Sequence, residues 1–226
     1  MFTNKSVLFI LMSIAMLTWG VAWTCAKIVN QYLNYNNLVF LRFLMGFITI
    51  LPFLYGRKIN FFNISFTTYL NIAITSTMFF FYNLCFFLGT DVGKSGMGGV
   101  FVTTTNPIIT FIIVSALAKD INIYKISAIS IGFFGGLCIL DVFNLDLNLF
   151  LSEGNVYFIF CSLIWGIMTV LMSNAQKNID SIWYIALCYA LSAIVASLFI
   201  NSDEILNYSI YDLKFFVNFF FVCAAM

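Results

Sequence analysis

Leu17-Thr18-Trp19-Gly20-Val21 lies within one long apolar run of the sequence, and Leu163-Ile164-Trp165-Gly166-Ile167 lies within another. Four further apolar runs separate the two copies, so the second copy falls five runs after the first. If each run crosses a bilayer, an odd offset turns the second copy upside down relative to the first. This pattern is typical of inverted repeats, in which two halves of one chain insert with opposite orientation.

The composition indicates an integral membrane protein. Of the 226 residues, 62% are hydrophobic and 8% are charged, whereas soluble domains carry about a quarter charged residues. Apolar runs of ~20 residues match the ~30 Å hydrocarbon core of a bilayer. The net charge of +1 provides no basic field for nucleic acid, so the lipid bilayer is an expected partner and nucleic acid is not.

The residue types needed for enzyme chemistry are sparse. Histidine is absent, which removes a His general base and a His metal ligand. The six cysteines are scattered without CxxC spacing and are interpreted as small buried hydrophobes. No Asp or Glu lies at the centre of a predicted span, so proton coupling has no obvious carrier. We therefore expect no enzyme, no catalytic residue, no metal and no cofactor.

The apolar runs predict an all-α integral membrane fold with two inverted five-helix repeats, over residues 1–145 and 154–226. The second repeat is incomplete, because two repeats need ten spans and about eight are visible. We expect the chain to be a truncated version of a longer protein, since the last span is short and the chain stops within apolar sequence. The first span is interpreted as retained rather than as a signal peptide. The predicted spans are 6–29, 37–56, 66–89, 95–117, 124–142, 155–174, 181–200 and 213–226.

The charges of the joints predict the orientation. With the N-terminus in the cytoplasm, six basic residues lie inside and four outside, in agreement with the positive-inside rule. We expect a multi-pass protein of the cell inner membrane. The inner basic residues are Lys5, Arg57, Lys58, Lys119, Lys125 and Lys177.

The order of several short motifs resembles the EamA-like family of the drug/metabolite transporter superfamily. The sequence departs from the family's pattern at Lys119-Asp120, where the family often has a glutamate, and at Ser173, which stands where the first copy has Lys27. The seventh span also lacks an Arg-Phe pair. The resemblance implies ten helices and transport of small metabolites, and it leaves the substrate open. The matching motifs are Trp19-Gly20 followed by Lys27, Arg42-Phe43, the small-residue turn 88–96, Asn106-Pro107, Gly132 with Gly135-Gly136, and Trp165-Gly166.

Lys27 and Arg42 are predicted about one turn from the outer ends of their helices, and two interpretations stay open. Their long side chains reach the headgroups by snorkelling, or they form a cationic mouth that attracts an anionic or zwitterionic substrate. Both cations oppose the positive-inside bias, and each costs about 2–3 kcal/mol near mid-membrane, which favours the second interpretation. A lipid-facing Arg42 supports the first.

The remaining candidate substrate-binding residues are polar or aromatic side chains inside predicted spans. Pro107 bends its helix and frees a carbonyl beside a run of threonines, so this turn either packs as a kink or lines a cavity. Trp19 is expected at the interface of the repeats, with cavity lining as the alternative. Tyr82 and Asn83 are expected to face the interior. The candidates are Lys27, Arg42, Trp19, Tyr82, Asn83, Thr104 and Asn106.

Four glycines are predicted to allow close helix packing, because a missing Cβ lets another helix approach. The function predicted from the whole pattern is a secondary transporter, a permease or exporter of a small polar metabolite or drug that works by alternating access. The alternative is a non-transporting membrane fragment or scaffold from a truncated gene. Self-association as a homo-oligomer stays open. The four glycines predicted to allow close helix packing are Gly20, Gly132, Gly136 and Gly166.

Overall fold

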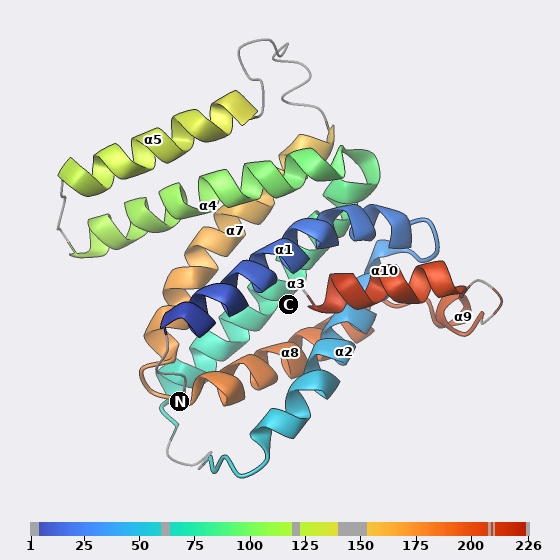
Figure 1. The fold of residues 1–226 in the computed structure, drawn as a ribbon. Coiled ribbons are helices and arrows are strands. Elements are labelled where there is room, and N and C mark those ends of the chain that lie inside the picture. Colours follow the sequence, from blue (N-terminus) through green and yellow to red (C-terminus); the bar gives the residue numbers. More distant parts are fainter. Residues whose placement is uncertain are drawn as a thin grey trace.

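The computed structural model describes residues 5–59, 64–118, 123–139, 153–207, 209 and 211–224. All regular structure within these residues is helical, which confirms the all-α prediction (Figure 1). The predicted end of the fifth span, most of the predicted boundary between the repeats and Met226 lie outside the described residues. The helices are α1 (Lys5–Val29), α2 (Tyr35–Leu54), α3 (Phe66–Val92), α4 (Ser95–Ala118), α5 (Ile123–Ile139), α7 (Glu153–Ala175), α8 (Ser181–Ser197), α9 (Ser202–Ile205) and α10 (Leu213–Ala224).

Five of these helices, α1, α2, α3, α4 and α7, are long and apolar enough to cross a membrane. Three shorter apolar segments lie in α5, α8 and α10. The eight predicted spans therefore correspond to eight apolar helices, of which five reach full spanning length within the described residues. The chain is a multi-pass membrane protein.

Polar side chains fix where several helices begin. Asn34 accepts a hydrogen bond from the backbone N–H of Asn36 at the start of α2, and Ser65 accepts one from Thr68 at the start of α3. Asp180 accepts from the N–H groups of both Ile182 and Trp183 at the start of α8. Each side chain satisfies N–H groups that have no partner within the helix.

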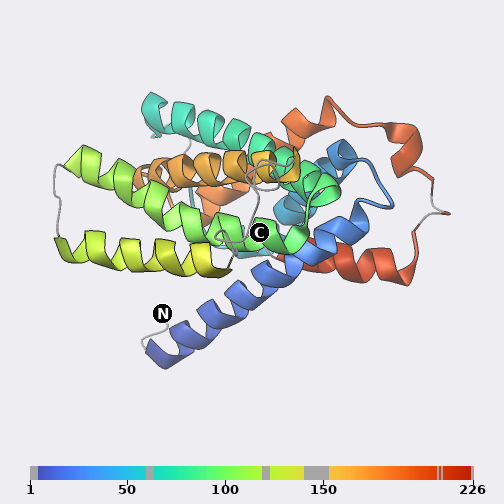
Figure 2. The same cartoon turned by 90° about the horizontal axis from the view of Figure 1, so that it is seen from above.

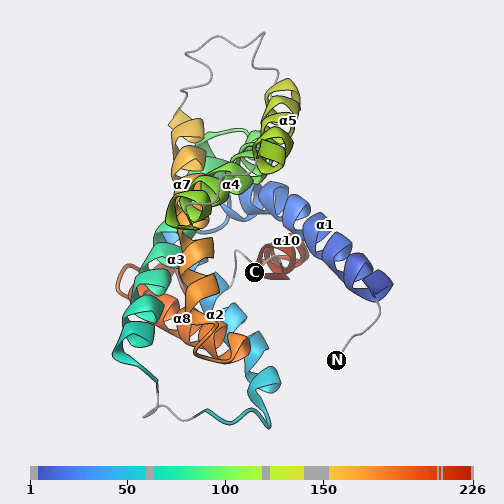
Figure 3. The ribbon, with the colours of Figure 1, turned by 90° about the vertical axis from the view of Figure 1, so that its left-hand side faces the viewer.

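The centre of the bundle is built from helices of both sequence halves. α7 packs along α3 and α4, and α8 packs along α2 and α3. α10 packs against α1, and α5 packs on α4 at the periphery (Figures 1 and 3). α7 runs antiparallel to α1 and α3, so the two Trp-Gly motifs lie on helices of opposite direction (Figure 1). The largest fully buried side chains include Trp23, Phe43, Phe86, Phe158 and Tyr184.

The N-terminal half of α1 projects away from the other helices (Figure 2). Its apolar side chains are exposed there, with Phe9 at 73% and Leu17 at 71% relative exposure. A soluble protein would lose about 25 cal/mol for each Å² of such surface left in water. Hydrocarbon solvates this surface without that loss, which agrees with a helix that faces lipid.

Candidate functional site

Trp19 of α1 and Trp165 of α7 meet inside the bundle. Their indole rings stack with centroids 6.2 Å apart and planes inclined by 28°. The ring of Tyr82 approaches Trp165 to 5.0 Å, and the ring of Phe79 meets it edge to face at 6.5 Å. The two copies of the Trp-Gly motif thus form one aromatic cluster with α3.

A cavity of about 240 Å³ lies beside this cluster, and we call it the central cavity. Five helices contribute to its wall: α1, α2 and α3 from the first half of the sequence, and α7 and α8 from the second. Phe79, Trp165 and Tyr189 each lie near the middle of their helix, so the cavity lies deep within the bundle. Its lining residues are Trp19, Arg42, Phe79, Tyr82, Asn83, Trp165, Met172, Ile185 and Tyr189.

Arg42 supplies the charge of the central cavity. The residue is 4% exposed, and its Nη1 donates a hydrogen bond of 2.6 Å to Oδ1 of Asn83. Asn83 is held in turn, because its Nδ2 donates to the carbonyl oxygen of Phe79 at 2.9 Å. The guanidinium carbon lies 4.9 Å from the ring centroid of Phe86, within range of a cation–π contact. The Nε of Arg42 is buried without a hydrogen-bond partner.

The structure places Arg42 deeper than the sequence predicted. α2 begins at Tyr35, so Arg42 lies two turns inside the helix rather than about one. Its burial excludes the lipid-facing orientation that snorkelling needs. A charged side chain at the centre of a membrane helix costs roughly 2.5–3.5 kcal/mol. The Asn83 amide and the aromatic ring of Phe86 offset part of this cost.

No carboxylate of the described residues pairs with Arg42. Within this part of the chain, the ion pair between Arg57 and Asp180 is the one that forms, and it lies at the exposed ends of α2 and α8. The central cavity therefore holds a buried cation, a positioned amide and several aromatic faces.

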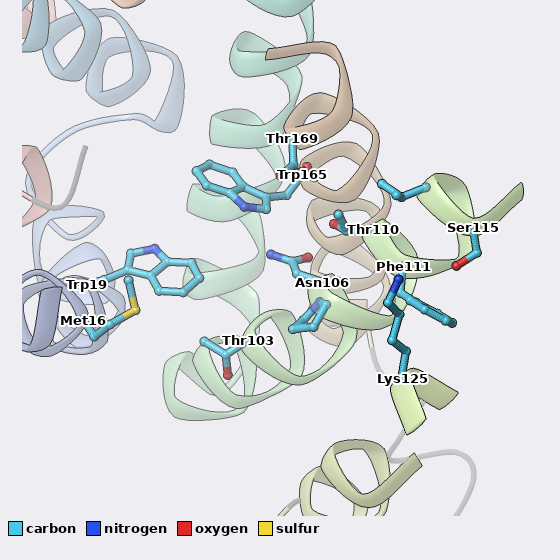
Figure 4. A pocket seen from close by; sticks show the side chains of 12 residues that line it. Met16, Trp19, Thr103, Asn106, Thr110, Phe111, Ser115, Lys125, Trp165 and Thr169 are labelled. Carbon is cyan, nitrogen blue, oxygen red and sulfur yellow. Dashed lines mark hydrogen bonds between the residues drawn. The ribbon is translucent and has the colours of Figure 1, made fainter. Parts of the chain in front are cut away.

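A second, larger cavity of about 680 Å³ also borders the tryptophan pair, and we call it the α4 cavity (Figure 4). Trp19 and Trp165 belong to the lining of both cavities. The α4 cavity is lined by Met16, Trp19, Thr103, Asn106, Pro107, Thr110, Phe111, Val114, Ser115, Lys125, Trp165 and Thr169.

Asn106 and Pro107 lie in the wall of the α4 cavity, as the kinked-helix prediction allows. With its amide nitrogen turned toward α7, Asn106 donates to the carbonyl oxygen of Ser162 at 3.1 Å. The neighbouring Thr105 hydroxyl lies 2.7 Å from the Ser162 hydroxyl. Thr104 is placed differently: its hydroxyl donates to the carbonyl of Val100 at 2.8 Å, and it lines neither cavity.

Lys27 is not brought to the central cavity. It is exposed, and its Nζ donates at 2.7 Å to the carbonyl oxygen of Gly93, the residue that caps the C-terminus of α3. A cation at this position complements the negative end of the helix dipole. The predicted cationic mouth thus separates into a buried Arg42 and a helix-capping Lys27.

The four predicted packing glycines fall into two groups. A Cβ on Gly166 would meet the side chain of Ile109 on α4, and a Cβ on Gly136 would meet Thr104. A Cβ on Gly20 or on Gly132 would have no atom within 4 Å, so these two glycines face open space. Of these four glycines, Gly136 and Gly166 are the two at which another helix packs closely.

Sequence reasoning missed Tyr189, which lines the central cavity beside Arg42. The spacing of the two Trp-Gly motifs holds the signal for this residue. Trp165 follows Trp19 by 146 positions, and Tyr189 follows Phe43 by the same 146 positions. Phe43 and Tyr189 are both buried, with ring centroids 6.1 Å apart.

Long apolar helices around a cavity that holds a buried arginine define an α-helical multi-pass membrane protein. The sequence model of the EamA-like transporter family matches residues 6–140, more than half of the chain, and the chain belongs to this family. The match extends over α1 to α5 and confirms the resemblance seen in the motifs. No curated protein and no solved structure matches the chain.

Proposed function

We propose that the protein is a secondary transporter that moves a small polar metabolite or drug across the membrane by alternating access. The observation that carries this proposal is the central cavity, where a buried arginine and two stacked tryptophans meet between helices of both sequence halves. Transporter sites lie typically near the bilayer midplane at the interface of two repeats. Membership of a transporter family supports the same function.

Inverted repeats are supported by a constant register between the two halves. Trp165 and Trp19 differ by 146 positions, and so do the helix-capping residues Asp180 and Asn34. The helix ends follow the same offset, because α7 ends at Ala175 where α1 ends at Val29. This constant offset supports a second half that repeats the first without an insertion over two helices.

The packing of helix pairs also supports a pseudo-twofold relation. An axis that exchanges α1 with α7, α2 with α8 and α3 with α10 would turn the α3–α7 contact into an α10–α1 contact. Both contacts are present, and α2 packs against its own counterpart α8. The stacked Trp19 and Trp165 lie where such an axis would bring equivalent residues together.

Two closures lie at opposite ends of the α2–α8 pair. At one end, Asn37 of α2 donates to the carbonyl of Asn201 at 3.2 Å and contacts Glu204. At the other end, Trp183 of α8 donates through Nε1 to the carbonyl of Arg57 at 3.1 Å. Positions 183 and 37 also differ by 146, so the closures are equivalent in the repeat. Alternating access requires each closure to open in turn.

With the N-terminus in the cytoplasm, the Arg57–Asp180 end is the cytoplasmic closure, because α1 carries the chain from the cytoplasmic face to the Asn37 end. The proposed substrate contacts are the cavity residues Trp19, Arg42, Tyr82 and Asn83, together with Trp165 and Tyr189. Asn106 belongs to the α4 cavity, which we assign to the substrate route beyond the tryptophans.

Reconstitution of the purified chain into vesicles tests the proposal. Vesicles preloaded with a panel of neutral, anionic and cationic metabolites are assayed for uptake of the same labelled compounds. A transporter gives saturable exchange of at least one compound. Exchange equal to that of protein-free vesicles for every compound favours the alternative, a non-transporting membrane fragment or scaffold.

A further inference from the structure

Arg42 has hydrogen-bonding capacity that the protein does not use. Its Nη1 donates to Asn83, whereas its Nε is buried without a partner. A guanidinium presents five N–H donors in a planar fork that matches a carboxylate. The side chain lines the central cavity, so a ligand that fills the cavity would lie against the guanidinium group.

The charge of the cavity is also unbalanced. Arg42 is the one charged residue among the nine that line it. A buried cation without a counterion favours an anion strongly, because the attraction is screened little there. A single cation balances a single negative charge, and a dianion would leave one charge buried without a partner.

The remaining wall suits an apolar group. Trp19, Trp165, Phe79, Tyr82 and Tyr189 present aromatic rings, and Met172 and Ile185 add aliphatic surface. Aromatic side chains pack well against flat apolar groups. The volume of about 240 Å³ restricts the ligand to a compact molecule.

From these three features we infer that the central cavity binds a compact organic monocarboxylate, with its carboxylate on Arg42 and its apolar body against the tryptophan pair. This inference rests on the proposed transport function and names its substrate class. Asn83 is the positioning residue, because its bond to Phe79 O directs Oδ1 toward the Arg42 guanidinium.

Phenylacetate, its neutral amide phenylacetamide and the cation phenethylamine test the inference, because they share a phenyl ring and differ in charge. Binding to the purified chain is followed by tryptophan fluorescence, since Trp19 and Trp165 line the cavity, and transport by exchange in vesicles. We expect phenylacetate to bind at least about tenfold more tightly than the amide, since the amide cannot satisfy the buried charge, and we expect no binding of the amine.

Two substitutions separate the charge from the fold. Asn83→Asp keeps the size of the side chain and places a fixed carboxylate 2.6 Å from Arg42, so it should lower phenylacetate affinity by about tenfold or more. Arg42→Gln should remove the preference for the anion over the amide. Lys27→Gln is the matched control, because it removes a cation that contacts Gly93 outside the cavity, and it should leave phenylacetate affinity unchanged.

The outcomes distinguish the two proposals. Equal affinities for phenylacetate and phenylacetamide would overturn the monocarboxylate assignment. An affinity for phenylacetate that Asn83→Asp leaves unchanged would overturn it as well. If other compounds still show saturable exchange in either case, the proposed transport function stands. Absence of exchange for every compound, these three included, overturns the transport function and the substrate class with it. If Arg42→Gln does not fold, the phenylacetate affinity of Asn83→Asp still tests the monocarboxylate assignment.

Discussion

The indole ring of Trp19 stacks on that of Trp165 across the interface between α1 and α7, with centroids 6.2 Å apart. The two residues occupy the same position in the Trp-Gly motif, 146 positions apart in sequence. They form part of the wall of both the central cavity and the α4 cavity.

A double-mutant cycle measures the stacking of this pair. Trp19→Ala, Trp165→Ala and the double variant are compared by thermal unfolding in detergent. We expect a coupling free energy of about 0.5–1.5 kcal/mol, the range for aromatic pairs beyond their burial. Additive losses would show that the rings stack without stabilising each other.

The equivalent glycines of the two motifs predict opposite effects of the same substitution. Gly166→Ala places a methyl group against Ile109 on α4, so it should destabilise the protein by about 1–3 kcal/mol through overpacking. Gly20→Ala enters open space, so it should be neutral or stabilise α1 by up to about 1 kcal/mol through helix propensity. Unfolding of the two variants in detergent checks this difference, and equal effects would contradict the packing of α7 on α4.

Local pattern was sufficient to predict the helices and the opposite directions of the two helices that carry the tryptophans. Long apolar runs lead to helices in a bilayer, because every backbone polar group must be satisfied within the segment. The odd number of runs between Trp19 and Trp165 predicted antiparallel helices, and α1 and α7 run in opposite directions. Both predictions depend only on length, hydropathy and order along the chain.

Contacts between distant helices were beyond local pattern. Lys27 caps α3 at Gly93, a partner 66 positions away, which depends on how α1 and α3 cross. Arg42 was placed too near the helix end because the capping hydrogen bond of Asn34 starts α2 at Tyr35, before the predicted start of the span. Thr104 faces Gly136 on α5 rather than a cavity, and only the rotation of α4 decides that.

A buried hydroxyl joins three helices and predicts a measurable loss. Tyr184 of α8 donates at 2.8 Å to Oδ1 of Asn71, and the hydroxyl of Thr75 also lies 2.8 Å away. Asn71 donates in turn to the carbonyl of Leu171 on α7. Tyr184→Phe should destabilise the protein by about 0.6–2 kcal/mol, because interhelical hydrogen bonds in membranes contribute modestly while buried acceptors left unpaired are costly.

The control for this substitution is Tyr55→Phe. Tyr55 is 94% exposed just after α2, so loss of its hydroxyl should leave the unfolding temperature unchanged. Equal unfolding temperatures for Tyr184→Phe and the wild-type protein would show that the Tyr184 hydroxyl is dispensable, because Oδ1 of Asn71 also accepts from the Thr75 hydroxyl at 3.4 Å.

The Arg57–Asp180 pair predicts that a helix cap contributes more than an ion pair. Both side chains are more than 40% exposed, at 47% and 41%, and exposed ion pairs contribute roughly 0–1 kcal/mol. Asp180 also accepts hydrogen bonds from the N–H groups of Ile182 and Trp183 at the start of α8. Asp180→Asn keeps the cap and removes the charge, so it should lower stability by less than about 1 kcal/mol. Asp180→Ala removes the cap and the charge, and it should lower stability by about 1 kcal/mol more than Asp180→Asn.

Thermal unfolding at low and high salt separates the contributions of the cap and the ion pair, because salt screens the ion pair and leaves the cap intact. A salt-dependent loss of equal size in both variants would instead make the ion pair, rather than the cap, the contact that holds this end of α8.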